Sequence, residues 1–274
     1  MRFEKFFLLG FFIGFSSFTY GQTADEYFNF GQAKFKIKEY KAAIVYYTKA
    51  TEANKKHASA FYYRGLAKAN IEEYEHATAD LTQALTIDPN LEGAYYARGL
   101  CKLAMQDDEK AMEDFSTTIT LAPALAGAYF YRAVCKGNLS DTKSAIEDYT
   151  EAIRIEPKNM DAYYNRAYQF AVIQNYRAAI ADYTKVLDSS PGQVSAYLNR
   201  SLCKAKLNDT TGAASDLKRA TELNKKDVSA YYNNIALNLN AGKKNVGSTN
   251  KLEGTVEQAH AIALEGIMKF SNKK

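Results

Sequence analysis

The sequence predicts an all-α fold, a solenoid of antiparallel helix pairs, and two observations carry that prediction. The only four prolines of the chain, Pro89, Pro123, Pro157 and Pro191, lie 34 residues apart. Between successive prolines, apolar residues recur at helical spacing in two stretches that are separated by a short polar break. A single helix pair leaves one apolar side uncovered, so such units stack to bury a continuous core.

The first 21 residues do not fit this repeat. Arg2 and Lys5 precede Phe6–Phe18, an uncharged run of 13 residues, and the small residue Gly21 follows shortly after. This pattern predicts a signal peptide over residues 1–21 that is cleaved after Gly21, and hence an exported protein, periplasmic or secreted. The run is shorter than the roughly 20 residues that a membrane-spanning helix needs. An uncleaved N-terminal anchor is the alternative.

Residues 58–91 represent one repeat. Small residues such as Gly65, in the first predicted helix, and Ala77 and Ala84, in the second, recur where two helices must approach each other closely. Pro89 ends the second helix, because proline lacks an N–H group and clashes with the preceding turn. Each unit is therefore a helix, a turn, an antiparallel helix and a stop.

This layout resembles the tetratricopeptide repeat family. The match lies in the 34-residue period, an aromatic residue at the fourth position, and Gly65, Ala77, Ala84 and Pro89 at the eighth, twentieth, twenty-seventh and thirty-second positions. The resemblance implies a right-handed superhelical solenoid over residues 22–240. Its six regular repeats cover residues 24–57, 58–91, 92–125, 126–159, 160–193 and 194–227, and positions below are counted within these repeats.

The chain departs from the family pattern at two positions that change together. Position 7 is arginine and position 23 is aspartate in repeats two to six, whereas the first repeat has Phe30 and Tyr46. We expect a structural ion pair between the two helices of each of these repeats, because pairing within a repeat leaves no charge unmatched. Independent surface charges are the alternative. The expected pairs are Arg64–Asp80, Arg98–Asp114, Arg132–Asp148, Arg166–Asp182 and Arg200–Asp216.

The C-terminal part is irregular. Residues 228–240 begin like a seventh first helix, and residues 241–254 are rich in Gly, Lys, Asn and Ser, which is typical of a flexible loop. Residues 255–274 have a helical pattern and a basic end, which predicts a divergent helix that caps the solenoid.

Charge and residue type exclude several functions. The excess positive charge lies in the Lys-rich tail, so the repeats lack the basic face that nucleic-acid binding requires. The three cysteines all occupy position 10, where small buried residues are expected, and the spacing of cysteine and histidine matches no metal site. We therefore expect no cofactor, no metal, no catalytic residues and no enzymatic activity.

The resemblance also implies that the first helices line a concave groove that binds a protein or peptide partner. In this chain the groove positions are rich in aromatic and amide side chains, which suit an extended peptide or a partner helix. By analogy with exported relatives of this repeat, assembly of envelope or secretion complexes is the expected role. Lys at position 5 and Asn at position 9, which the family uses to clamp carboxylates, are absent. A glycan-binding module, for instance for peptidoglycan, is the alternative function, and packing between neighbouring helices is the alternative role of the aromatic residues. The candidate partner-binding residues are Tyr62, Tyr96, Phe130, Tyr131, Tyr164, Asn165, Tyr168 and Asn199.

Overall fold

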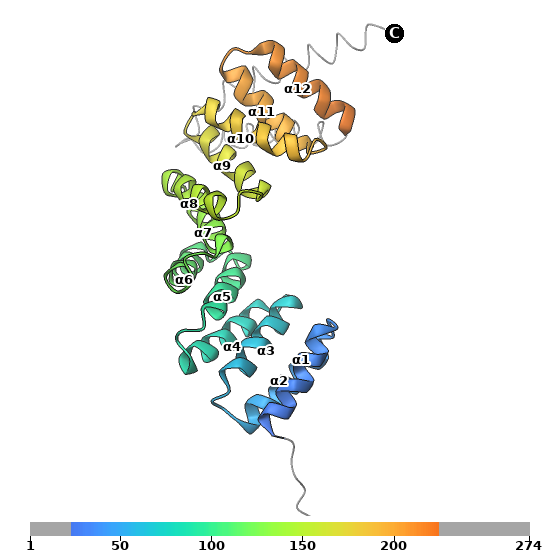
Figure 1. Ribbon diagram of the computed structural model, residues 1–274, viewed down its shortest axis with the longest axis vertical. Helices are drawn as coiled ribbons and strands as arrows, with labels where there is room; N and C mark the ends of the chain where they lie inside the picture. The colour runs from blue at the N-terminus through green and yellow to red at the C-terminus, as the bar shows by residue number, and fades with distance from the viewer. Residues whose placement is uncertain (1–22, 225–274) are drawn as a thin grey trace, which may run out of the picture.

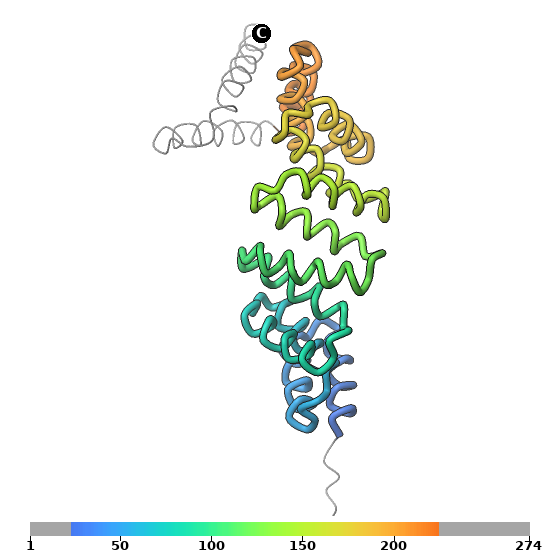
Figure 2. Tube along the Cα trace, turned by 90° about the vertical axis from the view of Figure 1, so that its left-hand side faces the viewer, coloured from blue at the N-terminus to red at the C-terminus, as the bar shows by residue number. Residues whose placement is uncertain are grey.

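The computed structural model describes residues 23–224, in which twelve α-helices form six antiparallel pairs stacked along one axis (Figure 1 and Figure 2). These residues contain no strand. Each helix contacts its partner, and each pair from α1 and α2 to α9 and α10 also contacts the next pair. The predicted solenoid is thereby confirmed. The helices are α1 (Ala24–Lys36), α2 (Tyr40–Ala53), α3 (Ala58–Asn70), α4 (Tyr74–Ile87), α5 (Glu92–Ala104), α6 (Asp108–Leu121), α7 (Ala126–Asn138), α8 (Thr142–Ile155), α9 (Met160–Val172), α10 (Tyr176–Ser189), α11 (Val194–Lys206) and α12 (Thr210–Leu223).

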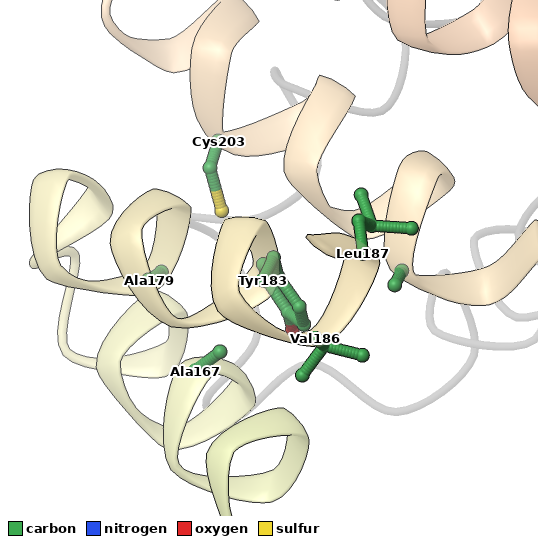
Figure 3. Close-up of a cluster of buried hydrophobic side chains, with 7 residues drawn as sticks. Ala167, Ala179, Tyr183, Val186, Leu187 and Cys203 are labelled. Atoms are coloured by element: carbon green, nitrogen blue, oxygen red, sulfur yellow. The ribbon is translucent and has the colours of Figure 1, made fainter. Parts of the chain in front are cut away.

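Small residues allow the helices to approach each other, as the pattern predicts. Alanine occupies position 20 in all six repeats and is at most 1% exposed there. A Cβ atom at Gly99 would lie 2.8 Å from the ring of Phe115, which fills the space between α5 and α6. In Figure 3, Ala167 of α9 and Cys203 of α11 lie on opposite sides of α10, which contributes Tyr183 and Val186 to the same buried cluster. The second helices from α2 to α10 are therefore each packed between two first helices.

The turn inside every repeat has a left-handed residue at position 15. This residue follows the C-cap of the first helix and has φ between 62° and 65°, yet none of the six is glycine. Left-handed backbone brings Cβ close to the following carbonyl oxygen, which costs roughly 1–2 kcal/mol for most residues. The turns therefore have the geometry of a helix C-terminus without the residue best suited to it. The six residues are Lys38, Glu72, Gln106, Ser140, Gln174 and Asn208.

The arginine at position 7 binds the aspartate at position 23 of its own repeat with two parallel hydrogen bonds. In repeat four, Arg132 Nε donates to Asp148 Oδ2 at 2.8 Å and Nη2 donates to Oδ1 at 2.7 Å. All five pairs have this geometry, with distances of 2.6–2.9 Å. The arginine side chains are 14–20% exposed and the aspartates 4–10%. These are largely desolvated, bidentate ion pairs.

The same guanidinium also reaches the preceding repeat, a contact that sequence reasoning missed. Arg132 Nη1 donates to Ser116 Oγ at 3.3 Å, and each of the other four arginines donates to the threonine at position 25 of the previous repeat at 2.9–3.2 Å. The sequence carries a signal for it. A hydroxyl residue occupies position 25 in repeats one to five, whereas repeat six has Lys218 there and the following unit has Asn234 in place of the arginine.

Two further groups complete this cluster. The aromatic ring at position 4 lies 5.2–5.7 Å from the arginine of its own repeat, within cation–π range. In four repeats the lysine at position 11 contacts the aspartate at 2.8 Å, as Lys136 does with Asp148. Repeat five differs, because Phe170 occupies position 11 and its ring lies 5.7 Å from Arg166. In repeat one, the rings of Phe30 and Tyr46 lie 5.6 Å apart where the ion pair would be.

Several expectations fall outside the described residues. They are the signal peptide over residues 1–21, the start of a seventh repeat over 228–240, the loop over 241–254 and the capping helix over 255–274.

The left-handed turn residue gives one prediction. Replacing Glu72 by glycine should raise the free energy of unfolding by about 0.5–1 kcal/mol, because glycine adopts positive φ without the Cβ clash, although it loses more chain entropy on folding. Urea unfolding measures this change. Asn208→Gly serves as the control. It should raise the free energy of unfolding by less, since asparagine tolerates this conformation better than glutamate does. An equal or larger gain at Asn208 would contradict the explanation.

The ion pairs give a second prediction. Arg132→Leu should lower the free energy of unfolding by about 1–3 kcal/mol, because Asp148 then keeps only Lys136 as a charged partner in a largely desolvated site. Adding Asp148→Leu should recover part of this loss in a double-mutant cycle. The exposed pair Arg154–Glu151 is the matched control, and Arg154→Leu should change stability by less than about 0.5 kcal/mol. Simple additivity of the Arg132 and Asp148 changes would rule out the coupling.

Candidate functional site on the inner face of the first helices

The first helices of successive repeats lie closer to one another than the second helices do. Among the described residues, α1 contacts α3, α3 contacts α5, and so on to α11, whereas no second helix contacts the second helix of the next repeat. The stack therefore curves towards the first helices. We call the side formed by α1, α3, α5, α7, α9 and α11 the inner face.

Two of the candidate tyrosines lie between neighbouring repeats. The hydroxyl oxygen of Tyr62 lies 2.8 Å, and that of Tyr96 lies 2.7 Å, from the point where a Cβ would stand at Gly93 and Gly127 respectively. Glycine at position 2 thus leaves room for the tyrosine of the repeat before it. Burial raises the pKa of both phenols, that of Tyr96 to about 12. Their rings are half-buried and hold adjacent first helices together.

Three other candidates also lie against core side chains. The ring of Phe130 lies 5.7 Å from Tyr149, and the ring of Tyr131 stacks on Phe115 at 5.8 Å. The ring of Tyr164 lies 5.5 Å from Tyr183 of the core cluster in Figure 3. These aromatic side chains therefore stabilise the repeat junctions, whatever else they contact.

The amides differ in what they bind. Asn199 Nδ2 donates to the Tyr164 hydroxyl at 2.9 Å, which links repeats five and six. Asn165 Nδ2 donates to the Asp161 carbonyl of its own helix at 2.8 Å. Tyr168 stands apart from all the other candidates, because 53% of it is exposed. Of the eight candidate residues, it alone is a large aromatic side chain that solvent reaches freely.

The central part of the inner face carries no charge. Positions 2, 5, 6, 9, 12 and 13 are the ones expected to face inwards, and in repeats two to four none of these eighteen residues is charged, although 24% of the chain is. The charged side chains of these repeats lie at the junction clusters, the turns, the second helices and, for Glu92, the first residue of α5. An occupant of this part would find aromatic, aliphatic and amide groups.

Reactive and metal-binding chemistry has little support in the described region. Within residues 23–224, no group of three or more His, Cys, Asp or Glu side chains is placed to hold a metal ion. Burial raises the pKa of Cys101 to about 11 and that of Cys135 and Cys203 to about 12, so these thiols stay protonated at neutral pH. No helix in this region combines the length and apolarity that crossing a membrane requires.

Several solved structures have the same fold. YrrB, described as a TPR protein with an unusual peptide-binding site, is 19% identical, with a TM-score of 0.62 over 69% of this chain and 97% of that one. MamA from Desulfovibrio magneticus RS-1 is 22% identical, with a TM-score of 0.60 over 63% and 98%. PilF from Pseudomonas aeruginosa is 16% identical, with a TM-score of 0.62 over 74% and 92%. No curated protein matches the chain.

Family comparison identifies the repeat over most of the described residues. Tetratricopeptide repeats match residues 24–57, 58–91 and 92–125, and a second description of the same repeat matches residues 136–193 and 170–228. Together these matches span more than two thirds of the sequence. The chain belongs to the tetratricopeptide repeat family.

Proposed function

We propose that this protein is an exported, non-enzymatic scaffold that binds a peptide segment of a protein partner on its inner face. Tetratricopeptide repeats support protein–protein interaction, which gives the general class. The observation that carries the finer proposal is the charge-free inner face of repeats two to four. Aromatic and aliphatic groups there supply contact area, and the neighbouring amides suit the hydrogen-bonding groups of a peptide backbone.

The comparison with YrrB is consistent with this proposal. The description of YrrB names a peptide-binding site, and the two chains share their fold over most of the length of YrrB. At 19% identity the binding residues are not transferable. The proposal for this chain therefore depends on its own inner face.

Export is the second part of the proposal. It is supported by the charged start, the apolar run and the small residue at Gly21 in the first 21 residues. An exported scaffold of this kind would act in the periplasm or outside the cell, where assembly of envelope or secretion complexes is a suitable role. The partner would then be another exported protein.

Exchanges at two tyrosines test where the partner binds. Tyr168→Ala should leave the melting temperature unchanged and reduce partner capture about tenfold, because this exposed ring is free to contact a ligand. Tyr164→Ala should lower the free energy of unfolding by about 2–4 kcal/mol, because its ring packs on Tyr183 and its hydroxyl binds Asn199. Cross-linking in the native envelope with mass spectrometry measures capture, and thermal unfolding measures stability.

Two outcomes would contradict this assignment. Full capture by the Tyr168 variant would remove its role in binding, and an unchanged melting temperature for the Tyr164 variant would remove its role in packing. If the protein sediments together with purified peptidoglycan and captures no peptide, the glycan-binding alternative is favoured.

The export proposal has its own test. N-terminal sequencing of the protein from its native host should find Gln22 as the first residue, because cleavage is expected after Gly21. Recovery of a chain that starts at Met1 in the membrane fraction would instead establish an uncleaved anchor.

A further inference from the structure

Repeat five differs from the other five repeats along the second half of its first helix. Residues 168–175, which are positions 9 to 16, contain no charged residue, whereas the same stretch contains at least two in every other regular repeat. The lysine that elsewhere contacts the junction aspartate is replaced by Phe170. The end of α9 and the turn after it therefore carry no charge.

The same stretch exposes three large apolar side chains. Tyr168 is 53% exposed, Val172 is 45% exposed and Ile173 is 43% exposed. Residues four apart lie on the same side of a helix, so Tyr168 and Val172 are neighbours and Ile173 adjoins them. We call these three residues the α9 patch. Leu139 and Leu207 hold the position of Ile173 in the two flanking repeats, and each is 42% exposed.

A buried amide lies beside the α9 patch. Gln169 is only 8% exposed and occupies position 10, which is alanine or cysteine in the other regular repeats. Its Nε2 lies 2.6 Å from the point where a Cβ would stand at Gly137, so it fits only because α7 has glycine there. No hydrogen bond of this side chain is found within residues 23–224, and its amide is not among the polar atoms there that are both fully buried and without a partner. The amide therefore keeps some contact with solvent at the edge of the α9 patch, where its N–H and C=O groups are available to a ligand.

A cation of the next repeat lies on the neighbouring first helix, α11. Lys206 holds the position of Val172 in the next repeat, and α9 contacts α11. The neighbouring Lys204 contacts Asp216, whereas Lys206 forms no ion pair with any residue between 23 and 224. Partial burial lowers the pKa of Lys206. A carboxylate supplied by a ligand would compensate for this desolvation.

We propose that the α9 patch, Gln169 and Lys206 form the specificity site of the inner face, and that they bind an extended peptide segment with apolar side chains and one carboxylate. The apolar side chains contact Tyr168, Val172 and Ile173. The Gln169 amide pairs with a backbone N–H and C=O of the peptide, and Lys206 pairs with the carboxylate. A basic peptide is disfavoured at this site, because Lys206 would repel its charge. The inference rests on the proposed peptide-binding function and names the place and the chemistry of the ligand.

The test uses the mature full-length chain and random nine-residue peptides displayed on phage. Selected peptides should contain at least two apolar residues and one acidic residue, with no lysine or arginine. Each is then synthesised and its dissociation constant measured by fluorescence anisotropy. Val172→Asp should weaken binding at least tenfold, because it puts a negative charge beside the carboxylate. Val45→Asp is the matched control, since Val45 is 54% exposed on α2, away from this site. This variant should bind the selected peptides with the same dissociation constant as the unchanged protein.

Two conservative changes test the polar contacts separately. Gln169→Met keeps the shape of the side chain and removes its hydrogen bonds, so it should weaken binding about threefold to tenfold without lowering the melting temperature. Lys206→Met should weaken binding of the acidic peptide by a similar factor. It should not change the affinity for an analogue of that peptide in which the acidic residue is replaced by its amide. Equal effects on both peptides would overturn the role of Lys206.

The remaining outcomes separate this inference from the proposed function. Peptides that bind but respond only to exchanges in repeats two to four, such as Tyr131→Ala, would overturn the α9 site and leave binding to the inner face intact. A library that yields no binder would overturn both. A photo-cross-linker at position 172 that captures residues 225–274, or a second copy of the chain, would also overturn the inference, because the patch would then be covered by the protein itself.

Discussion

One guanidinium group connects two repeats at each junction from the first repeat to the sixth. Through Nε and Nη2 the arginine binds the aspartate of its own repeat, and through Nη1 it binds the hydroxyl of the repeat before it. The planar fork holds both contacts at once, so it constrains the angle between the helices of a pair and the rotation between pairs. The shape of the inner face depends on that rotation, because each first helix is positioned by the repeat behind it.

A charged junction of this kind costs desolvation energy that an apolar residue would avoid. The aspartates are at most a tenth exposed, and in four repeats a lysine as well as the arginine neutralises them. Replacing such a cluster by apolar side chains is often neutral for stability, so its benefit lies in geometry. An apolar contact between helices tolerates sliding, whereas two hydrogen bonds to one carboxylate and a third to a hydroxyl tolerate very little.

The ion pair and the inner face use different sides of each first helix, so the inner-face residues of one repeat can change without disturbing the ion pair. Position 7, which carries the arginine, and position 9, which carries Tyr168, are two residues apart and hence about 200° apart around the helix. Residues 168–175 have therefore lost all their charges while Arg166 keeps its two bonds to Asp182 and its bond to Thr150. A specialised inner surface in repeat five is compatible with an unchanged stack.

The sequence by itself determined the fold, the repeat boundaries and the partners of the arginines, because each depends on a local pattern that recurs every 34 residues. Arginine and aspartate appear together in five repeats and are absent together in the first, which identifies them as partners before any distance is known. Only the tertiary structure decided which candidate aromatic residues face solvent. Tyr164 and Tyr168 are both tyrosines on the inner side of α9, yet the first packs on Tyr183 and the second is half exposed. That difference in exposure depends on how closely the neighbouring helices approach, which is set by glycines and alanines far away in the chain. The repeat pattern of the sequence therefore does not predict it.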